Sequence, residues 1–509
     1  MPALADAPSH RSAPSPASDP DAPPSPGLAR ALLLLAGPGV YALAFALAPS
    51  SLPTDARHVL GIAAWMALWW LTEVVPLAAT SLLPLGLFPL LGVASARDAA
   101  APYANELVFL YLGGFFLAAA LEQWRAHERL AFGILGAIGT GSRRIVLGVM
   151  VATAFVSMWI SNTATAAMMY PIALAIGRLA PEGRDGGNLR TALMLGVAYA
   201  ASIGGMATLV GTPPNLIFAG AARELAGTNV DFVRFMMVGL PAAAVLLPLC
   251  WAMLVFVLHP SRSPLGHGAD ALVHERRVAL GPLVGGERRV LAVFALTALA
   301  WLLREPKDFG AFTVPGLTTL APGVTDASLG VLAAVLLFAL PGRTPEGTRR
   351  PLLTWREARG IPWDALLLFG GGLSLAAAME SSGLARWLGG LMQGLAGAPS
   401  LLIFAGLAVL VLVLSEIGSN TAVATIAMPL AASLAAAVGQ PPVVLMLVAA
   451  LAASAGFALP IATPPNTIVF GSGYVSVRQM ARAGILLDLL AILVVVATVW
   501  LIAPLAGFR

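Results

Sequence analysis

Apolar stretches of roughly 20 residues recur along this chain, separated by short polar segments. Clear examples are residues 28–48, 232–258, 326–341 and 484–507, and residues 290–303 with their flanks. As a helix, a stretch of this length crosses a hydrocarbon core of about 30 Å. Backbone groups in lipid must be satisfied within the segment, and a helix does this. The pattern therefore predicts an all-α polytopic membrane protein.

Composition supports the membrane class and excludes an ordinary soluble domain. Of the 509 residues, 58% are hydrophobic and only 11% are charged, with a mean hydropathy of +0.86. The formal charge of +4 does not indicate nucleic acid as a partner, because the basic residues lie in loops. Residues 1–27 are rich in Pro, Ser, Ala and Asp, and we interpret them as a disordered cytoplasmic tail.

The distribution of arginine predicts the orientation of the chain. Segments 259–289 and 342–360 contain five arginines each and are therefore expected in the cytoplasm. With the N-terminus also inside, the remaining basic residues fit about eleven spans and a periplasmic C-terminus. The predicted location is the bacterial inner membrane, with the lipid bilayer as a partner.

The two halves of the chain resemble each other at a nearly fixed offset. Phe109–Glu122 reads FLYLGGFFLAAALE, and Leu367–Glu380, 258 residues later, reads LLFGGGLSLAAAME. The tripeptide Ser-Asn-Thr occurs at 161–163 and again, 258 residues later, at 419–421. The arginine pattern places equivalent loops on opposite sides of the membrane, so we predict two inverted-topology repeats. Such repeats are typical of secondary transporters.

The repeats divide the chain into four parts. We expect the tail 1–27, a first transmembrane half 28–258 with the first helix and repeat 1, a cytoplasmic loop 259–289, and a second half 290–509 with repeat 2.

Each Ser-Asn-Thr lies between two apolar runs that are short for independent spans. We predict two re-entrant helical hairpins, at 144–180 and 400–438, with the tripeptide at the tip. Lipid allows such a break only where it is buried in protein or lines a wet cavity.

A second repeated motif predicts a broken helix in each half. Thr-Pro-Pro-Asn occurs at 212–215 and, 251 residues later, at 463–466. Paired prolines remove two backbone donors and disfavour the α conformation before them, so the helix must open there. Free carbonyls with hydroxyl and amide oxygens suit sodium, and helix N-termini suit an anion.

Other readings remain open at this stage. A membrane-embedded enzyme would need a nucleophile–base pair or metal ligands at membrane depth, and no histidine lies within an apolar run. We therefore predict no enzymatic activity. Trp65, Trp69 and Trp70 read as an aromatic belt that faces lipid. A channel is a further alternative, and uptake that saturates and stops without a sodium gradient would distinguish a transporter from it.

These motifs together resemble the divalent anion–sodium symporter family, which carries dicarboxylates, citrate or sulfate. The resemblance rests on WLTE from Trp70 with Pro76, FLYLGGFFLAAALEQW from Phe109, SMWISNTATAAMM from Ser157, and SEIGSNTAVATIAMP from Ser415. The two Pro-Pro-Asn motifs complete it. It covers roughly residues 30–507 and implies a homodimeric elevator transporter with a scaffold domain and a transport domain.

By similarity, the family's ligand positions fall on particular residues of this chain. Those implied for the first sodium ion are Ser157, Ser161, Asn162 and Gly211, and for the second Ser415, Ser419, Asn420 and Ala462. Those implied for the substrate dianion are Asn162, Thr163, Pro214, Asn420, Thr421, Thr463 and Pro465. Ser415 stands where a threonine is expected, which keeps the hydroxyl.

The resemblance implies sodium-coupled symport of a C4-dicarboxylate such as succinate, malate or fumarate. Sodium-coupled transport of sulfate or a tricarboxylate, and sodium-independent dicarboxylate exchange, stay open as alternatives.

The predicted topology is testable with a reporter fused to Arg509. A reporter that is active only in the cytoplasm should remain silent there, because the arginine bias places this end in the periplasm. The same reporter fused within 259–289 is the positive control. An active fusion at Arg509 would contradict the eleven-span topology.

Overall fold

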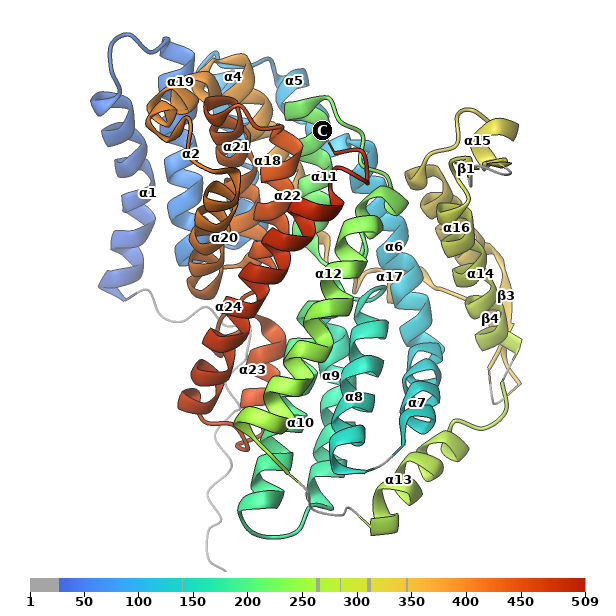
Figure 1. Ribbon diagram of the computed structural model, residues 1–509. Coiled ribbons are helices and arrows are strands. Elements are labelled where there is room, and N and C mark those ends of the chain that lie inside the picture. Colours follow the sequence, from blue (N-terminus) through green and yellow to red (C-terminus); the bar gives the residue numbers. More distant parts are fainter. Residues whose placement is uncertain are drawn as a thin grey trace, which may run out of the picture.

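The computed structural model of the chain is almost entirely helical (Figure 1). It describes residues 27–139, 141–261, 266–283, 285–308, 313–344 and 347–508. The predicted tail up to residue 26 and the terminal Arg509 lie outside the described residues.

The elements follow one another in chain order. The first part contains α1 (Leu28–Leu47), α2 (Thr54–Thr72), α3 (Leu77–Thr80), α4 (Leu83–Leu90), α5 (Ala96–Ala100), the 3₁₀ helix η1 (Ala101–Ala104), α6 (Glu106–Gln123) and α7 (Ala126–Ile138). The middle contains α8 (Ser142–Ser157), α9 (Asn162–Arg178), α10 (Arg184–Gly205), α11 (Pro213–Ala226), α12 (Phe232–Ala252), the π-helix η2 (Met253–Leu258), α13 (Gly266–Ala279) and α14 (Gly285–Leu302).

The remaining elements include two short β-ribbons. They are β1 (Lys307–Asp308), β2 (Thr313–Val314), α15 (Leu317–Leu320), α16 (Asp326–Ala339), β3 (Pro341–Arg343), β4 (Arg349–Pro351), α17 (Trp355–Ala358), α18 (Trp363–Ser381), α19 (Leu384–Leu391) and the 3₁₀ helix η3 (Gln393–Leu395). The chain ends with α20 (Ser400–Ile417), α21 (Asn420–Val438), α22 (Pro442–Ala453), α23 (Pro464–Phe470) and α24 (Val477–Ile502). Strands β1 and β2 pair antiparallel, as do β3 and β4.

Several helices are long and apolar enough to cross a membrane. Within the described part of the chain there are six: α1, α5 continued through α6, α12 continued through η2, α20, α21 and α24. Counting α18 with α19, which meet at a bend of 76°, gives seven. The structure thus confirms a mostly helical protein with several possible spans, and the count of eleven stays a prediction.

The helix ends follow from local sequence chemistry. Asn105 accepts a hydrogen bond from the Leu107 amide at the start of α6, and Ser161 does so from the Ala164 amide at the start of α9. Ser476 and Gln479 form a reciprocal capping box at the start of α24. These side chains satisfy amides that the first turn of a helix leaves without partners.

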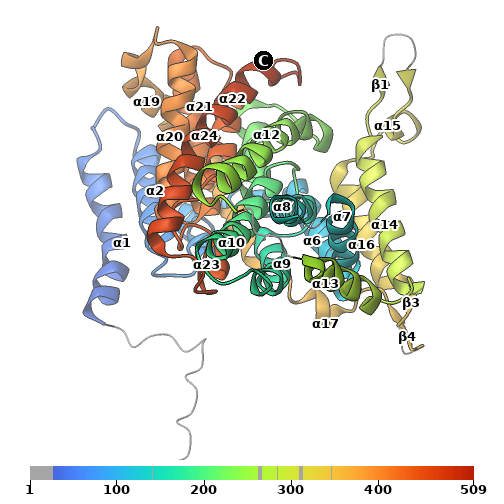
Figure 2. The ribbon, with the colours of Figure 1, turned by 60° about the horizontal axis from the view of Figure 1, so that its bottom comes forward.

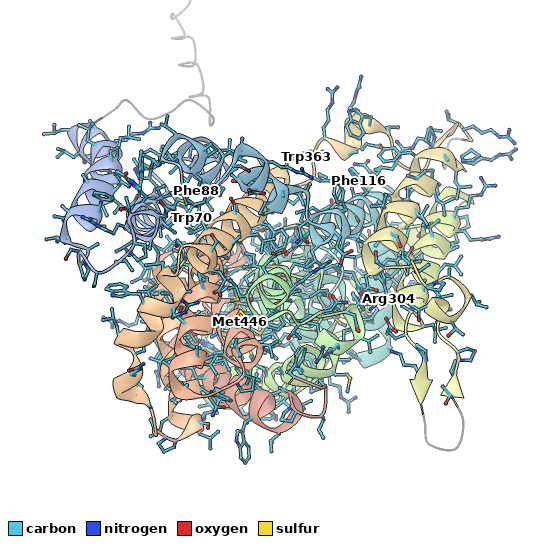
Figure 3. All side chains as sticks on the ribbon, turned by 90° about the horizontal axis from the view of Figure 1, so that it is seen from above. Trp70, Phe88, Phe116, Arg304, Trp363 and Met446 are labelled. Atoms are coloured by element: carbon cyan, nitrogen blue, oxygen red, sulfur yellow. The ribbon has the colours of Figure 1, made fainter. Side chains whose placement is uncertain are left out.

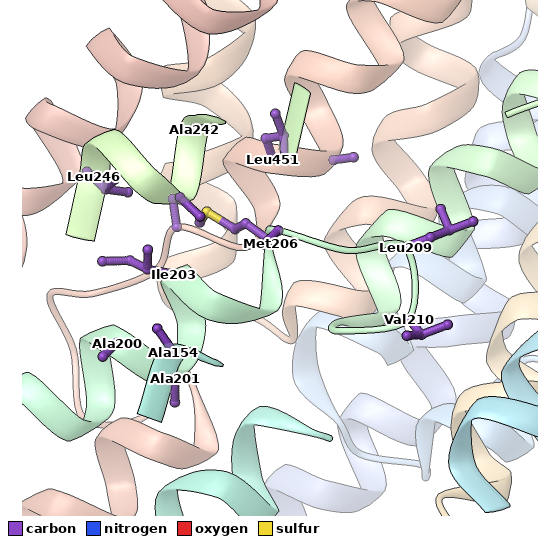
Figure 4. Close-up of a cluster of buried hydrophobic side chains, with 14 of the residues drawn as sticks. Ala154, Ala200, Ala201, Ile203, Met206, Leu209, Val210, Ala242, Leu246 and Leu451 are labelled. Carbon is purple, nitrogen blue, oxygen red and sulfur yellow. The ribbon is translucent and has the colours of Figure 1, made fainter. Parts of the chain in front are cut away.

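The buried hydrophobic residues form two clusters. The larger joins α6–α12 to the C-terminal helices, and Figure 4 shows part of it, where Ile203 and Met206 meet Ala242, Leu246 and Leu451. The smaller joins α2 and α4 to α18, and its Trp70 and Phe88 lie together in Figure 3. The two clusters involve different faces of the long helix α18.

Trp70 corrects one interpretation made from the sequence. Its ring is fully buried and its indole Nε1 donates to the Leu77 carbonyl at 3.2 Å, so it does not face lipid. Trp65 and Trp69 are half-buried and meet edge to face. A polar N–H inside an apolar cluster needs an acceptor, and the chain turn after α2 supplies it.

The two halves of the chain interlock at the centre of the molecule. Helix α11 of the first half packs against α21 and α22 of the second. Conversely, α23 of the second half packs against α9 and α10 of the first. Figure 2 shows α23 beside α9 and α10. The four helices that begin at the repeated motifs, α9, α11, α21 and α23, therefore converge on one region.

Candidate functional site

The first Ser-Asn-Thr motif lies at a break between two helices. Helix α8 ends at Ser157 and α9 begins at Asn162, while the re-entrant hairpin at 144–180 stays a prediction. The Ser157 hydroxyl lies 2.8 Å from Asn162 Oδ1 and 2.7 Å from the Ala201 carbonyl oxygen of α10. Since one hydroxyl proton serves only one of two acceptors, this cluster contains more oxygen lone pairs than donors.

The second Ser-Asn-Thr motif repeats this arrangement 258 residues later. Helix α20 ends at Ile417 and α21 begins at Asn420. The Ser415 hydroxyl lies 2.6 Å from Asn420 Oδ1 and 2.6 Å from the Ala453 carbonyl oxygen of α22. Ser157 and Ser415 are both fully buried. The sequence repeat is thus also a repeat of side-chain contacts.

The Thr-Pro-Pro-Asn motifs begin α11 and α23 with the same backbone geometry. Thr212 has φ −146° and ψ 146°, and Thr463 has φ −143° and ψ 148°, so both are extended. The following proline occupies the first helical position, where its missing N–H costs nothing. Both motifs therefore end a segment of open backbone, as predicted.

The asparagine of each motif holds that open backbone in place. Asn215 Nδ2 donates to the carbonyls of Gly205, at 2.9 Å, and Thr208, at 2.7 Å. Asn466 Nδ2 donates to the Leu459 carbonyl at 3.0 Å. Both side chains are fully buried, and both Oδ1 atoms lack a hydrogen-bond partner in the described structure.

Tyr111 is a residue that our sequence reasoning did not assign to the site. Its hydroxyl donates to the Pro213 carbonyl at 2.8 Å, with the Thr212 carbonyl at 3.3 Å. It is nearly fully buried in α6, within the first FLYLGGFF run. A buried tyrosine hydroxyl needs a hydrogen-bond acceptor, and here the acceptors are the backbone carbonyls at the start of α11.

A cavity of about 1080 Å³ lies where the four motifs meet. Of the residues predicted for substrate, Asn162, Thr163, Asn420, Thr421, Thr463 and Pro465 line it, together with the predicted sodium ligands Ser161, Gly211, Ser419 and Ala462. Ser157 and Ser415 lie behind the wall, and Pro214 is buried while its neighbour Pro213 lines the cavity. The structure therefore brings most of the predicted set around one space.

The charge of the cavity wall is unusual for an anion site. No Arg or Lys is among the described lining residues, whereas two carboxyl side chains, Glu73 and Asp364, are. Glu73 also has a left-handed backbone, with φ 48° and ψ 25°, directly after α2. A dianion in this space must obtain its positive partners from helix ends or from bound cations.

Close packing fixes the first tip against the broken helix behind it. A Cβ atom on Gly205 would lie 3.1 Å from Asn162 Cγ and 3.0 Å from Asn162 Nδ2. Only a glycine therefore lets the end of α10 approach the amide of Asn162.

Broken helices that converge on one cavity, in a chain with several apolar helices of spanning length, are typical of a membrane transport protein. The chain belongs to the sodium:sulfate symporter family, whose transmembrane-region model matches residues 29–506. This confirms the family predicted from the motifs.

Named relatives agree with this assignment, and one solved structure has a similar fold. The chain is 40% identical over 479 residues to the sodium-dependent dicarboxylate transporter SdcS of Staphylococcus saprophyticus. The matched region covers 92% of this chain and 91% of that protein. It is 38% identical over 463 residues to SdcS of Staphylococcus aureus, with 90% and 88% covered. Its fold is similar to the crystal structure of the Alcanivorax borkumensis YdaH transporter, with TM-score 0.54 and 15% identity over 95% and 99% of the two chains.

Proposed function

We propose that this protein carries a C4-dicarboxylate, such as succinate, malate or fumarate, together with sodium ions across the membrane. It acts as a symporter in which the sodium gradient drives uptake. The sodium-dependent dicarboxylate transporters at 38–40% identity support both the cation and the class of anion.

The main support for the proposal is a pair of matching oxygen clusters, one in each half of the chain. In each half, a buried serine hydroxyl has two acceptor oxygens within 2.8 Å, one from an asparagine at a helix break and one from a neighbouring helix. Oxygen-rich clusters with few donors are the surroundings that hard cations prefer. Two such clusters beside one cavity support two sodium sites.

We assign the sodium ligands from these clusters and the adjoining breaks. The first ion is held by Ser157, Ser161, Asn162 and Gly211, and the second by Ser415, Ser419, Asn420 and Ala462. Asn162 and Asn420 each belong to a cluster and also line the cavity, so each serves the cation and the anion together.

The substrate lies between the two tips. Helices α9 and α21 both begin at residues that line the cavity, so their amide ends face it. Such ends favour negative charge. Asn162, Thr163, Asn420, Thr421, Thr463 and the backbone around Pro214 and Pro465 hold the two carboxylates, with a threonine hydroxyl for each.

The transport cycle is an elevator movement within a homodimer in the bacterial inner membrane. The interlocked helices α8–α11 and α20–α23 form the moving domain, and each hairpin enters the membrane and turns back. Eleven spans with the N-terminus inside agree with the arginine bias. In Figure 1, α13 and the C-terminal end lie at opposite ends of the molecule, which supports this topology.

Uptake into proteoliposomes tests the proposed function. Labelled succinate should accumulate when an inward sodium gradient is present and should not when choline replaces sodium. Labelled sulfate and citrate are compared in the same vesicles. Uptake of sulfate in place of succinate would overturn the substrate, and sodium-independent uptake driven by internal dicarboxylate would overturn symport.

Removing one hydroxyl from each tip tests the substrate assignment. Thr163→Ala and Thr421→Ala should each raise the KM for succinate about tenfold, since a hydrogen bond to a charged group contributes about 1–2 kcal/mol. Sodium binding without substrate should change little.

Thr297→Ala is the matched control, because Thr297 is a buried threonine on α14 whose hydroxyl donates to the Val293 carbonyl, away from the cavity. It should transport normally. If both tip variants fold and show the KM of the unmodified chain, the two threonines do not contact substrate.

A further inference from the structure

The two breaks differ in length, although their motifs match. Helix α10 continues to Gly205, whereas α22 ends at Ala453, three residues before Gly456, the counterpart of Gly205 at an offset of 251. The backbone amides after Gly456 are therefore outside a helix in the second half. Inside a membrane protein such amides need acceptors from the protein itself.

Two buried carboxyl groups supply these acceptors. Glu416 Oε1 accepts from the Ala458 amide at 2.8 Å, and Glu416 Oε2 accepts from the Leu459 amide at 2.9 Å. Asp488 of α24 accepts from the Phe457 amide at 3.3 Å. Glu416 and Asp488 are only 8% and 6% exposed. Three successive amides are thus held by side chains from two different helices.

Helix α24 comes close to the open segment for a steric reason. Gly484 precedes Asp488 by one helical turn, and a side chain there would overlap the backbone of Phe457 and Ala458. Glycine lets the open segment lie directly on α24, within reach of Asp488.

A short chain of hydrogen bonds joins Glu416 to the second sodium cluster. The Leu459 carbonyl accepts from the Ala462 amide at 3.2 Å and from Asn466 Nδ2 at 3.0 Å. Ala462 lines the cavity, and Ser415, which contacts Asn420, directly precedes Glu416. Glu416 therefore ties the end of α20, which presents Ser415, to the segment that presents Ala462.

The first half has a different, uncharged connection at the same place. Met158 is the counterpart of Glu416, and Thr208 is the counterpart of Leu459. The Thr208 hydroxyl donates to the Met158 backbone carbonyl at 2.5 Å. The amides of Met206 and Ala207 still bond to carbonyls of α10. The first break therefore needs no carboxylate to close it.

We propose that Glu416 is a positioning residue for the second sodium site, with no equivalent at the first. This inference rests on the proposed function. Glu416 does not contact the ion; its two hydrogen bonds set the position of Ala462 relative to Ser415 and Asn420. Partners of this kind, one shell away from a metal ion, typically alter affinity by 10–100-fold when they are changed.

Glu416→Gln tests the inference, because the glutamine keeps the volume but presents an N–H group to one of the two amides. The half-saturating sodium concentration for succinate uptake should rise about tenfold or more. The KM for succinate at saturating sodium should stay within about twofold of the unmodified chain, because the tips keep their hydroxyls. A general loss of structure would lower maximal uptake and leave the sodium dependence unchanged.

Asp326→Asn is the matched control. Asp326 is a buried acid that accepts from the Phe232 amide at 2.9 Å, but it pairs with Arg304 and does not line the cavity. The half-saturating sodium concentration of the Asp326→Asn variant should equal that of the unmodified chain. If Glu416→Gln does not yield folded protein, Glu416→Asp, which retracts the carboxylate by one methylene, should shift the sodium dependence in the same direction.

The unmodified chain is measured in the same vesicles. Absence of sodium-dependent uptake there would overturn the proposed function. If the unmodified chain shows sodium-dependent uptake and the folded Glu416 variant has the same sodium dependence, only the proposed role of Glu416 is overturned.

Discussion

Open backbone within a membrane protein must find its hydrogen-bond partners in the protein or in a water-filled cavity, and this constraint shapes the centre of the molecule. Four helices start at breaks, and each break is held by polar side chains. Asn215 and Asn466 bind the carbonyls, Tyr111 binds the first Thr-Pro turn, and Glu416 binds the amides of the second break. At the two Ser-Asn-Thr breaks, serine hydroxyls, asparagine oxygens and helix carbonyls form two clusters, and we propose that sodium binds there.

The proposed sodium sites would explain how a cavity with no Arg or Lys among its described lining residues holds a dianion. Arg or Lys would attract the substrate permanently and would also repel sodium from the neighbouring clusters. Under the proposed function, sodium ions beside Asn162 and Asn420 would instead bring positive charge only when they are bound, next to the N-terminal ends of α9 and α21. Binding of the anion would then depend on the cations, and this dependence would couple the two in transport.

Much of this could be predicted from the sequence, because periodicity and breaks are local properties. The repeated motifs predicted both helix breaks, between Ser157 and Asn162 and before Asn420, and both open segments. The roles of Tyr111 and Glu416 could not be derived, because their partners lie about 100 and 42 residues away in the sequence. Trp70 was misread for the same reason: its burial depends on α18, which no local pattern reveals.

Calorimetry of succinate binding to the purified protein tests whether binding of the anion requires sodium. The measurement is made in sodium buffer and in choline buffer of equal ionic strength. We predict saturable succinate binding in sodium buffer and none in choline buffer, because the described cavity wall has no side chain of positive charge. Binding of equal affinity in both buffers would contradict it, since the positive partner of the substrate would then belong to the protein itself.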